Sequence, residues 1–547
     1  MRAAARTIIR TLLLALLTGS AAESASPPRP NIILIMADDL GYSDLGCYGG
    51  EIRTPNLDRL ARDGLRFSQF YNNAICPASR ASLLSGLYSQ QVGDRRFLGC
   101  VTLAEALKAA GYRTLMSGKW HLDGHPLKRG FERYYGLLTG TCNHFNPGRR
   151  RSGEPEPGKK FAGDEQPFSI EGKVFRPYTP DDRRFYSTDA FTDHAIGYLK
   201  QYGREKRPFF LYLAYTVPHY PLHAWPEDIA RYRGRFMAGW DTLRRERHRR
   251  LVREGLISDQ SELPPRSPHA PAWDEVPDKE AWDLKMAVYA AMVDRMDQNI
   301  GRLMETVRSL GKERNTLVLF LSDNGASDED RTRTPGLRPG PVESYRSVDL
   351  PWANLSNTPF RQFKRWNHEG GIATPLVAYW PRGIARPGRI SPELGHLIDI
   401  MATCLEVAGA DYPSEVNGMK IPPLEGRSLL PIFQGSTREG HEALFWNQRG
   451  LWRAVRQGRW KLVSPDHWIR YQPWRPSGTD WTVPPAPEDA ESLWQLFDMD
   501  ADRTEKRNLA SRHPKRVKAM GRLYQAWKQR VSKDGESALE GEMRGEE

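Results

Sequence analysis

Several short apolar runs along the chain end abruptly in polar residues. They lie at residues 32–36, 209–215 and 317–321, and further runs at 113–116 and 375–380 extend the pattern. Apolar runs of this length without alternation are typical of strands buried on both faces of a sheet. The polar residues that follow them include Asp38, Asp39, His219, Asp323 and Asn324. The sequence therefore predicts buried strands with polar side chains at their carboxyl ends.

Helical patterns lie between these runs. The clearest spans residues 282–310, where apolar side chains recur every three or four residues and Gly311 follows as a helix stop. Alternating strands and helices predict an α/β fold with a large, mostly parallel sheet flanked by helices on both faces. Ligands of such sheets bind outside the carboxyl ends of the strands, where the polar residues lie.

The pattern changes from about residue 443 to short aromatic and β-branched segments, followed by a helical stretch at 514–531. We expect a smaller C-terminal antiparallel sheet plus helix. The predicted organisation is a catalytic α/β domain at 29–438, a C-terminal α+β subdomain at 439–534 and a disordered tail at 535–547. Residues 148–179 and 234–277 are rich in proline, glycine and charge, and predict long loops.

The N-terminus has a basic start, a short apolar centre and a small-residue exit at residues 19–22. This order is typical of an export signal, predicted here at residues 1–22. No other segment approaches the ~20 apolar residues of a membrane helix. We expect an exported protein, periplasmic or extracellular, without a membrane span.

Composition is that of a folded protein, with 39% hydrophobic and 27% charged residues. The formal charge of +12 favours anionic extracellular substrates or polymers over nucleic acid, although solvated charged loops explain most basic residues equally well. The five cysteines are Cys47, Cys76, Cys100, Cys142 and Cys404. Their odd number and spacing exclude a disulfide scaffold or zinc ribbon, and leave one or two bridges open.

The pairs Asp38–Asp39 and Asp323–Asn324 offer oxygen ligands that suit a hard divalent cation. Such a pair alone is more often a turn or a helix cap than a metal site, but two pairs at strand ends of one sheet favour a metal. Zinc fits less well, because convergent His and Cys ligands are lacking. His219 and His223 are four residues apart, but Pro218 and Pro221 argue against a helix that would align them.

Cations and imidazoles stand near two further strand ends. Lys119 and His121 follow one strand and His219 follows another, while Arg80 and Lys364 lie elsewhere in the chain. Such groups suit a doubly charged oxyanion and its proton transfers. Each of them singly could also be a solvated or hydrogen-bonded side chain, so the set carries the interpretation.

The stretch "CPASRASLLSG" at Cys76 resembles the signature of the type I sulfatases, in which a cysteine is converted to formylglycine. The segments "NIILIMADDLGYSDLGCYGG", "TPNLDRLARDGLRF", "GKWHL", "HPLKRGFERYYG", "VPHYPLHA", "LSDNGA", "NTPFRQFKRWNHEGGIATPLVAYWP" and "LFDMDADRTEKRNLA" are similar to that family's blocks, in the same order. They cover nearly the whole chain after the leader. The sequence looks most like bacterial arylsulfatases of the alkaline phosphatase superfamily.

The resemblance implies a role for each candidate residue. Asp38, Asp39, Asp323 and Asn324 would hold one calcium ion, with the modified Cys76 as a further ligand. Arg80 would orient the formylglycine, Lys119 and Lys364 would grip sulfate oxygens, His219 would assist the leaving alcohol, and His121 would be the base that breaks down the intermediate. The implied partners are a sulfated small molecule or glycan and a maturation enzyme that generates formylglycine.

The sequence departs from the family pattern at two positions. Ala78 stands where the common motif has proline, and Pro77 fills the variable position before it, which bears on how a maturation enzyme recognises Cys76. Asp123 stands where glycine often follows "GKWHL" and could change the pocket wall.

Two alternatives to a sulfuric ester hydrolase stay open. One is a phosphonate or phosphate ester hydrolase on the same scaffold, and the other is a silent binder of sulfated glycans. Six late tryptophans could stack on sugars or fill the small sheet's core. They are Trp446, Trp452, Trp460, Trp468, Trp474 and Trp481.

Overall fold

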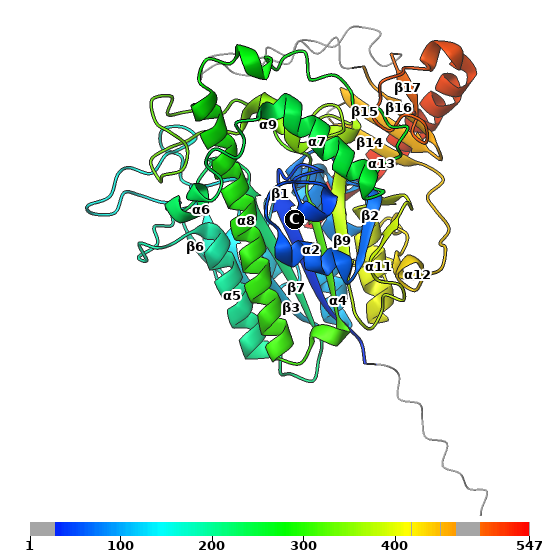
Figure 1. Cartoon of the computed structure of the whole chain (residues 1–547). Helices are drawn as coiled ribbons and strands as arrows, with labels where there is room; N and C mark the ends of the chain where they lie inside the picture. The colour runs from blue at the N-terminus through cyan, green and yellow to red at the C-terminus, as the bar shows by residue number, and fades with distance from the viewer. Residues whose placement is uncertain (1–27, 417, 449, 466–492, 546–547) are drawn as a thin grey trace, which may run out of the picture.

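The computed structural model describes residues 28–545 except 417, 449 and 466–492. The predicted export signal and three of the six late tryptophans, Trp468, Trp474 and Trp481, lie outside the described residues. A large sheet runs through the middle of the molecule, with helices on both sides and a second small sheet at one end (Figure 1). This arrangement confirms the predicted fold class.

The large sheet has eleven strands. Ten follow one another in the order β10 (Arg389–Ser391), β2 (Leu65–Tyr71), β9 (Ala373–Tyr379), β8 (Thr316–Ser322), β1 (Asn31–Asp38), β7 (Phe209–Pro218), β3 (Arg113–Gly118), β4 (Arg133–Leu137), β5 (Phe168–Ile170) and β6 (Lys173–Phe175), and β11 (Gly395–His396) also pairs with β2. The strands from β8 to β4 are parallel, whereas β9 is antiparallel to both of its neighbours. The five predicted apolar runs are thus β1, β3, β7, β8 and β9.

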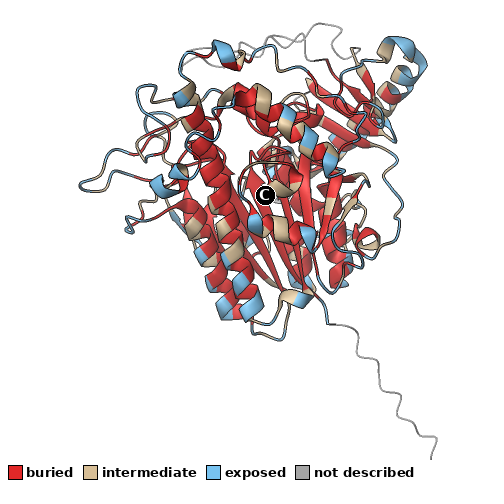
Figure 2. Ribbon diagram, viewed as in Figure 1, coloured by how far each residue is buried: buried red, intermediate tan, exposed pale blue. Residues whose placement is uncertain are grey.

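Helices cover the two faces of the sheet. One face carries α2 (Pro55–Arg62), α5 (Ser187–Tyr202) and α8 (Lys279–Ser309), and the other carries α3 (Cys76–Ser85), α4 (Leu103–Ala109) and α11 (Ile398–Ala408). Alternate residues of β1 enter the two cores: Ile33 and Ile35 pack under α8, whereas Ile32, Leu34 and Met36 face α3 and α11. The central strands are therefore buried along their whole length (Figure 2).

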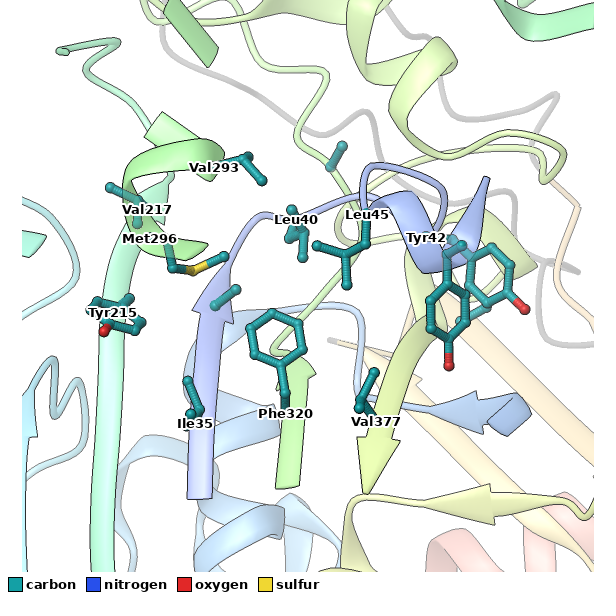
Figure 3. Close-up of a cluster of buried hydrophobic side chains, with 14 of the residues drawn as sticks. Ile35, Leu40, Tyr42, Leu45, Tyr215, Val217, Val293, Met296, Phe320 and Val377 are labelled. Atoms are coloured by element: carbon teal, nitrogen blue, oxygen red, sulfur yellow. The ribbon is translucent and has the colours of Figure 1, made fainter. Parts of the chain in front are cut away.

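The close-up of the core shows how α8 meets the sheet (Figure 3). Val293 and Met296 of α8 approach Tyr215 of β7 and Ile35 of β1, and Phe320 of β8 lies beside them. All five are buried. The long helix predicted at 282–310 is α8, whose apolar stripe closes this face of the core.

Shorter elements connect the large ones. They are α6 (Pro226–Ala230), α7 (Gly239–Arg253), α9 (Asp349–Ser356), α10 (Glu369–Ile372), α12 (Leu430–Phe433) and the hairpin of β12 (Glu415–Val416) and β13 (Met419–Lys420). Within the described residues, none of the helices is long and apolar enough to cross a membrane.

The segment 234–277 is not a loop throughout, as the sequence suggested, because α7 forms within it. Two of its arginines point inward. Arg247 is fully buried and pairs with Asp44 and Glu51, and Arg244 is also buried. The basic cluster at 244–250 is therefore partly structural and not simply a charged surface. In the segment 148–179, the short strands β5 and β6 interrupt the expected loop.

The small sheet has four antiparallel strands in sequence order, and it packs against a terminal helix. The elements are β14 (Leu444–Gln448), β15 (Trp452–Gln457), β16 (Trp460–Val463), β17 (Gln495–Asp498) and α13 (Pro514–Gly545). Trp446 and Trp452 are buried in the core, and Trp460 packs against it, so these three serve packing. Residues 535–545 of the tail expected to be disordered are helical as the end of α13, and Gly535 lies against the backbone of Gln90.

Candidate active site

The two acidic pairs meet at the carboxyl ends of β1 and β8. Because these parallel strands pair in register up to Ala37 and Ser322, the residues that follow are neighbours. The backbone N–H of Asp39 donates to Asp323 Oδ1 at 3.3 Å, and Asn324 Nδ2 donates to Asp39 Oδ1 at 2.6 Å. Asp39 has a left-handed backbone, φ 66°, which turns the chain sharply where the strand stops.

Three buried cations face these carboxylates. Lys119 Nζ lies 2.5 Å from Asp38 Oδ2 and Lys364 Nζ lies 2.6 Å from Asp39 Oδ1. Arg80 Nη2 donates to Asp323 Oδ2 at 2.8 Å, and its Nη1 donates to the carbonyl of Lys119. Three cations thus compensate three carboxylates in a region where an unpaired charge would be costly.

The pKa values of the buried groups reflect this balance between burial and opposite charges. Burial alone would raise the pKa of Asp38, but Lys119 and His219 outweigh it and the pKa is lowered. Burial and the neighbouring Asp38 raise the pKa of Asp323. Burial would lower the pKa of Lys364, yet Asp39 and Cys76 hold it well above its usual value.

Several oxygens of the same cluster are buried and unused. Asp38 Oδ1, Asp39 Oδ2 and Asn324 Oδ1 have no hydrogen-bond partner among the described residues. Asp38, Asp323 and Cys76 each offer a ligand atom, and these atoms lie within 4.8 Å of one another. Buried acceptors without donors are rare, and two carboxylates with an amide oxygen suit a hard divalent cation. The donor set therefore fits a calcium ion.

Cys76 begins α3 beside this oxygen cluster. The preceding Ile75 is extended, and the helix ends at Gly86, whose φ of 68° suits a glycine stop. Asn73 supports the start of the helix, because its Nδ2 donates to Ala78 O and Ser82 Oγ. Cys76 is only 5% exposed, and burial raises the pKa of its thiol. An unmodified Cys76 would therefore be a poor nucleophile at neutral pH.

Known proteins resemble this chain over most of its length. The family model described as Sulfatase matches residues 30–410. The chain is 35% identical to an arylsulfatase of Klebsiella aerogenes, over 75% of this chain and 93% of the relative. It is 33% identical to an uncharacterized sulfatase of Schizosaccharomyces pombe (90% and 92%), and 30% identical to the N-acetylgalactosamine-6-sulfatase of Homo sapiens (80% and 75%). The chain belongs to the sulfatase family.

Solved structures agree with this assignment. Ps i-CgsB, solved in complex with k-i-k-neocarrahexaose, superposes with a TM-score of 0.63 at 24% identity and covers 93% of both chains. A phosphonate monoester hydrolase of Agrobacterium radiobacter superposes with a TM-score of 0.53 at 18% identity, covering 92% of this chain and 96% of that one. These likenesses show a shared fold. The family model and the sulfatase relatives make this chain a sulfuric ester hydrolase.

Two histidines of the sulfatase flank the acidic cluster. His219 Nε2 lies 3.7 Å from Asp39 Oδ2, and its Nδ1 lies 2.7 Å from the carbonyl of Tyr220. A carbonyl only accepts, so Nδ1 carries a proton and Nε2 faces the cluster. The pKa of His219 is lowered, chiefly by burial, which Asp39 partly offsets. His223 lies just after β7 and not on a helix with His219, and its Nε2 lies 2.8 Å from Ser344 O.

His121 lies against Gly140, where an added Cβ would come within 2.8 Å of the imidazole ring. Its φ is 58°, and its Nδ1 is buried without a hydrogen-bond partner among the described residues. Burial first, and then Lys119 and Arg80, hold the pKa of His121 well below its usual value. The imidazole is therefore neutral at physiological pH and can accept a proton.

Hydrogen bonds or ion pairs join eight of the candidate residues: Asp38, Asp39, Arg80, Lys119, His219, Asp323, Asn324 and Lys364. Cys76 lies within 4.8 Å of ligand atoms of Asp38 and Asp323, and His121 comes two residues after Lys119. The carboxylate of Asp123 pairs with Arg95 at 3.1 Å, and both side chains are about half exposed. All five cysteines are free thiols, so the bridges left open by the sequence do not form.

Sequence reasoning missed Tyr220 and Glu329. The hydroxyl of Tyr220 donates to Glu329 Oε2 at 2.9 Å, and its ring lies 4.1 Å from that of His219, centroid to centroid. Tyr220 directly follows the candidate His219, and this adjacency could have identified it as a residue of the site. Glu329 stands in an acidic loop, and nothing in its local sequence marks it as buried.

Proposed function

We propose that this sulfatase cleaves its ester with a formylglycine formed from Cys76, assisted by one calcium ion. The observation that carries the proposal is a buried cluster of oxygens beside Cys76. Asp38 Oδ1, Asp39 Oδ2 and Asn324 Oδ1 have no hydrogen-bond partner among the described residues, and ligand atoms of Asp38, Asp323 and Cys76 lie within 4.8 Å of one another. A hydrated formylglycine supplies a hydroxyl nucleophile that an ordinary cysteine lacks. Bound calcium lowers the pKa of a coordinated hydroxyl and neutralises developing charge.

The chain's own cations bind and orient the ester. Without metal, three carboxylates and three cations balance, so a divalent cation leaves the site positively charged and favours an anionic substrate. Lys119 and Lys364 are placed to contact sulfate oxygens. Arg80, held by Asp323 and by the carbonyl of Lys119, fixes the side chain one helical turn ahead of it at Cys76.

The histidines move protons at defined atoms. His219 Nε2 faces the cluster and is the donor to the departing alcohol; when it is protonated, Asp39 at 3.7 Å stabilises the imidazolium. His121, held neutral by burial and its cationic neighbours, accepts the proton whose removal expels sulfate. His219 is buried, which limits the access of water to the reacting atoms on its side of the site.

The substrate class we propose is a sulfated carbohydrate or an aryl sulfate. The relatives include an arylsulfatase and N-acetylgalactosamine-6-sulfatases, and one structural neighbour was solved in complex with k-i-k-neocarrahexaose. We further propose export, supported by the leader-like composition of residues 1–22. N-terminal sequencing of the mature protein tests this, and a start near residue 23 is expected.

One measurement tests the central proposal: the mass of the tryptic peptide 67–80 from protein made in its native host. An aldehyde at Cys76 is the expected result. An intact thiol, together with calcium-independent retention of sulfated polymer and no sulfate release, would instead favour a silent glycan binder.

A phosphonate or phosphate ester hydrolase is the second candidate, supported by the fold likeness to the phosphonate monoester hydrolase. Rates on matched aryl sulfate and aryl phosphonate esters separate the two. We expect the sulfate ester to be cleaved faster. A clear preference for the phosphonate would reverse the assignment.

A further inference from the structure

A group of cations lies immediately beyond the proposed sulfate site. Glu329, 3% exposed, accepts from Arg331 Nη2 at 2.7 Å and pairs through the same oxygen with Arg365. Its other oxygen accepts from the hydroxyl of Tyr220, next to His219. One buried carboxylate thus anchors two guanidinium groups, whose side chains remain 19% and 32% exposed. The guanidinium groups of Arg331 and Arg365 are therefore partly accessible to solvent beside the proposed sulfate site.

The backbone places Arg365 beside the nucleophile. Arg365 has φ 79° and donates its N–H to the carbonyl of Ala74 at 2.6 Å, and Ala74 itself has φ 60°. Left-handed non-glycine residues are strained and persist where the surrounding structure demands them. Lys364 comes one residue before Arg365 and Cys76 two residues after Ala74, so the strained pair fixes the rim cations relative to the reacting atoms.

A third cation completes the group. Lys160 is half-buried on a loop that is fixed to the segment after β8: Arg333 Nε donates to Lys160 O at 2.9 Å, and Gly158 N donates to Val342 O at 2.9 Å. Burial, and then Arg331, lower the pKa of the Lys160 ammonium, and Glu329 and Asp164 partly offset this.

Two guanidinium groups, those of Arg331 and Arg365, share the carboxylate of Glu329. Asp328 and Asp164 also contribute negative charge near Arg365 and Lys160. Arg331 Nε is nevertheless buried with no partner among the described residues, so it remains a donor for a bound anion. An arginine held at one end presents a planar fork that suits carboxylate or sulfate oxygens.

We propose that Lys160, Arg331 and Arg365 form a subsite for a second anionic group, sulfate or carboxylate, on the substrate. The proposal rests on the function proposed above and refines it: the preferred substrate carries another negative charge near the ester that is cleaved. Glu329 is a positioning residue that acts through the two arginines.

The test compares three sugars on the purified, calcium-loaded enzyme. N-acetylgalactosamine 6-sulfate has one charge, its 4,6-disulfate adds a sulfate, and its disaccharide with glucuronic acid adds a carboxylate. Dissociation constants come from the ligand-induced rise in Tm, which does not depend on turnover. We expect at least one doubly charged sugar to bind about tenfold more tightly than the 6-sulfate, and the preference to weaken with added salt.

Variants then assign the preference to residues. Arg331→Gln and Lys160→Gln should each reduce the preference about tenfold, chiefly through KM where the sugar is hydrolysed. Glu329→Gln keeps the shape and should raise KM for the doubly charged sugar much more than it changes kcat. Arg338→Gln, exposed on the same loop, is the matched control and should change neither value.

Turnover of 4-nitrophenyl sulfate, measured in parallel, tests the proposed function separately from the proposed subsite. If that ester is cleaved but all three sugars bind equally, the second subsite is refuted and the proposed function stands. If it is not cleaved while the sugars keep the charge preference, the function is in question and the subsite remains. Equal preferences in wild type and Arg331→Gln would also overturn the subsite.

Discussion

Replacing Asp399 with asparagine perturbs a buried ion-pair group that supports the segment before Cys76. Asp399 Oδ1 accepts from His441 Nε2 at 2.6 Å, and Oδ2 accepts from Arg438 Nη2 and from the N–H of His396, both at 3.0 Å. His396 in turn places Nε2 3.1 Å from Asn73 Oδ1, and Asn73 holds the start of α3. The carboxylate thus connects the segment after the main domain to the nucleophile helix.

The magnitude follows from the pKa of Asp399. Burial alone would raise it, but His441 and Arg438 outweigh burial and lower the pKa from 3.8 to about 2. Each pKa unit corresponds to about 1.4 kcal/mol, so the ionised carboxylate contributes on the order of 2 kcal/mol to the free energy of unfolding. Because the folded pKa lies below the unfolded one, this contribution is complete above about pH 4 and is lost as the pH falls towards about 2.

Urea unfolding at pH 7 and at stepwise lower pH is the assay. We expect Asp399→Asn to lose about 2 kcal/mol or more at pH 7, since Arg438 is left buried without its anion. The deficit should shrink below pH 4. Asp411→Asn, exposed shortly after the same helix, is the control and should unfold like the wild type. A variant as stable as wild type at pH 7, or a deficit that stays constant down to pH 3, would refute the reasoning.

Four further predictions concern the site itself. Cys76→Ala should abolish sulfate release and leave fold and calcium binding largely intact; sulfate release by this variant would remove the nucleophile assignment. His121→Ala should release the alcohol in the first turnover and then stall, whereas unchanged steady-state turnover would show that another group is the base. His219→Ala should slow esters of poorly acidic alcohols by about 10²-fold or more and aryl esters much less, and an equal loss on both would argue against its role as acid. EDTA should lower Tm and stop turnover, with recovery on adding calcium; a Tm and rate insensitive to chelation would exclude the metal.

Much of the site could be predicted from sequence because its residues follow buried strands. Asp38, Asp39, Asp323 and Asn324 come directly after apolar runs, and parallel strands bring such ends together. Cys76 lies at a helix start and was found only through its resemblance to the sulfatase motif. Local sequence and a family motif therefore account for the catalytic residues.

The remaining features depend on contacts that sequence patterns do not encode. Helix α7 escaped detection because two of its inward positions, Arg244 and Arg247, are charged, and hydropathy treats them as exposed. The antiparallel β9 could not be separated from its parallel neighbours, since both kinds of strand are equally apolar here. The position of Glu329 beside the site could not be predicted, because its hydrogen-bond partner Tyr220 lies 109 residues away along the chain.

The hydrogen bond from Trp446 to the carbonyl of Asn72 joins residues 374 positions apart. During synthesis, Cys76 leaves the ribosome long before β14, which carries Trp446, has been made. In the complete fold, with the small sheet beside the nucleophile segment, Cys76 is only 5% exposed. Any protein that modifies Cys76 must therefore act while the chain is still being synthesised or before it folds, so the order of events during biosynthesis decides whether a molecule becomes active.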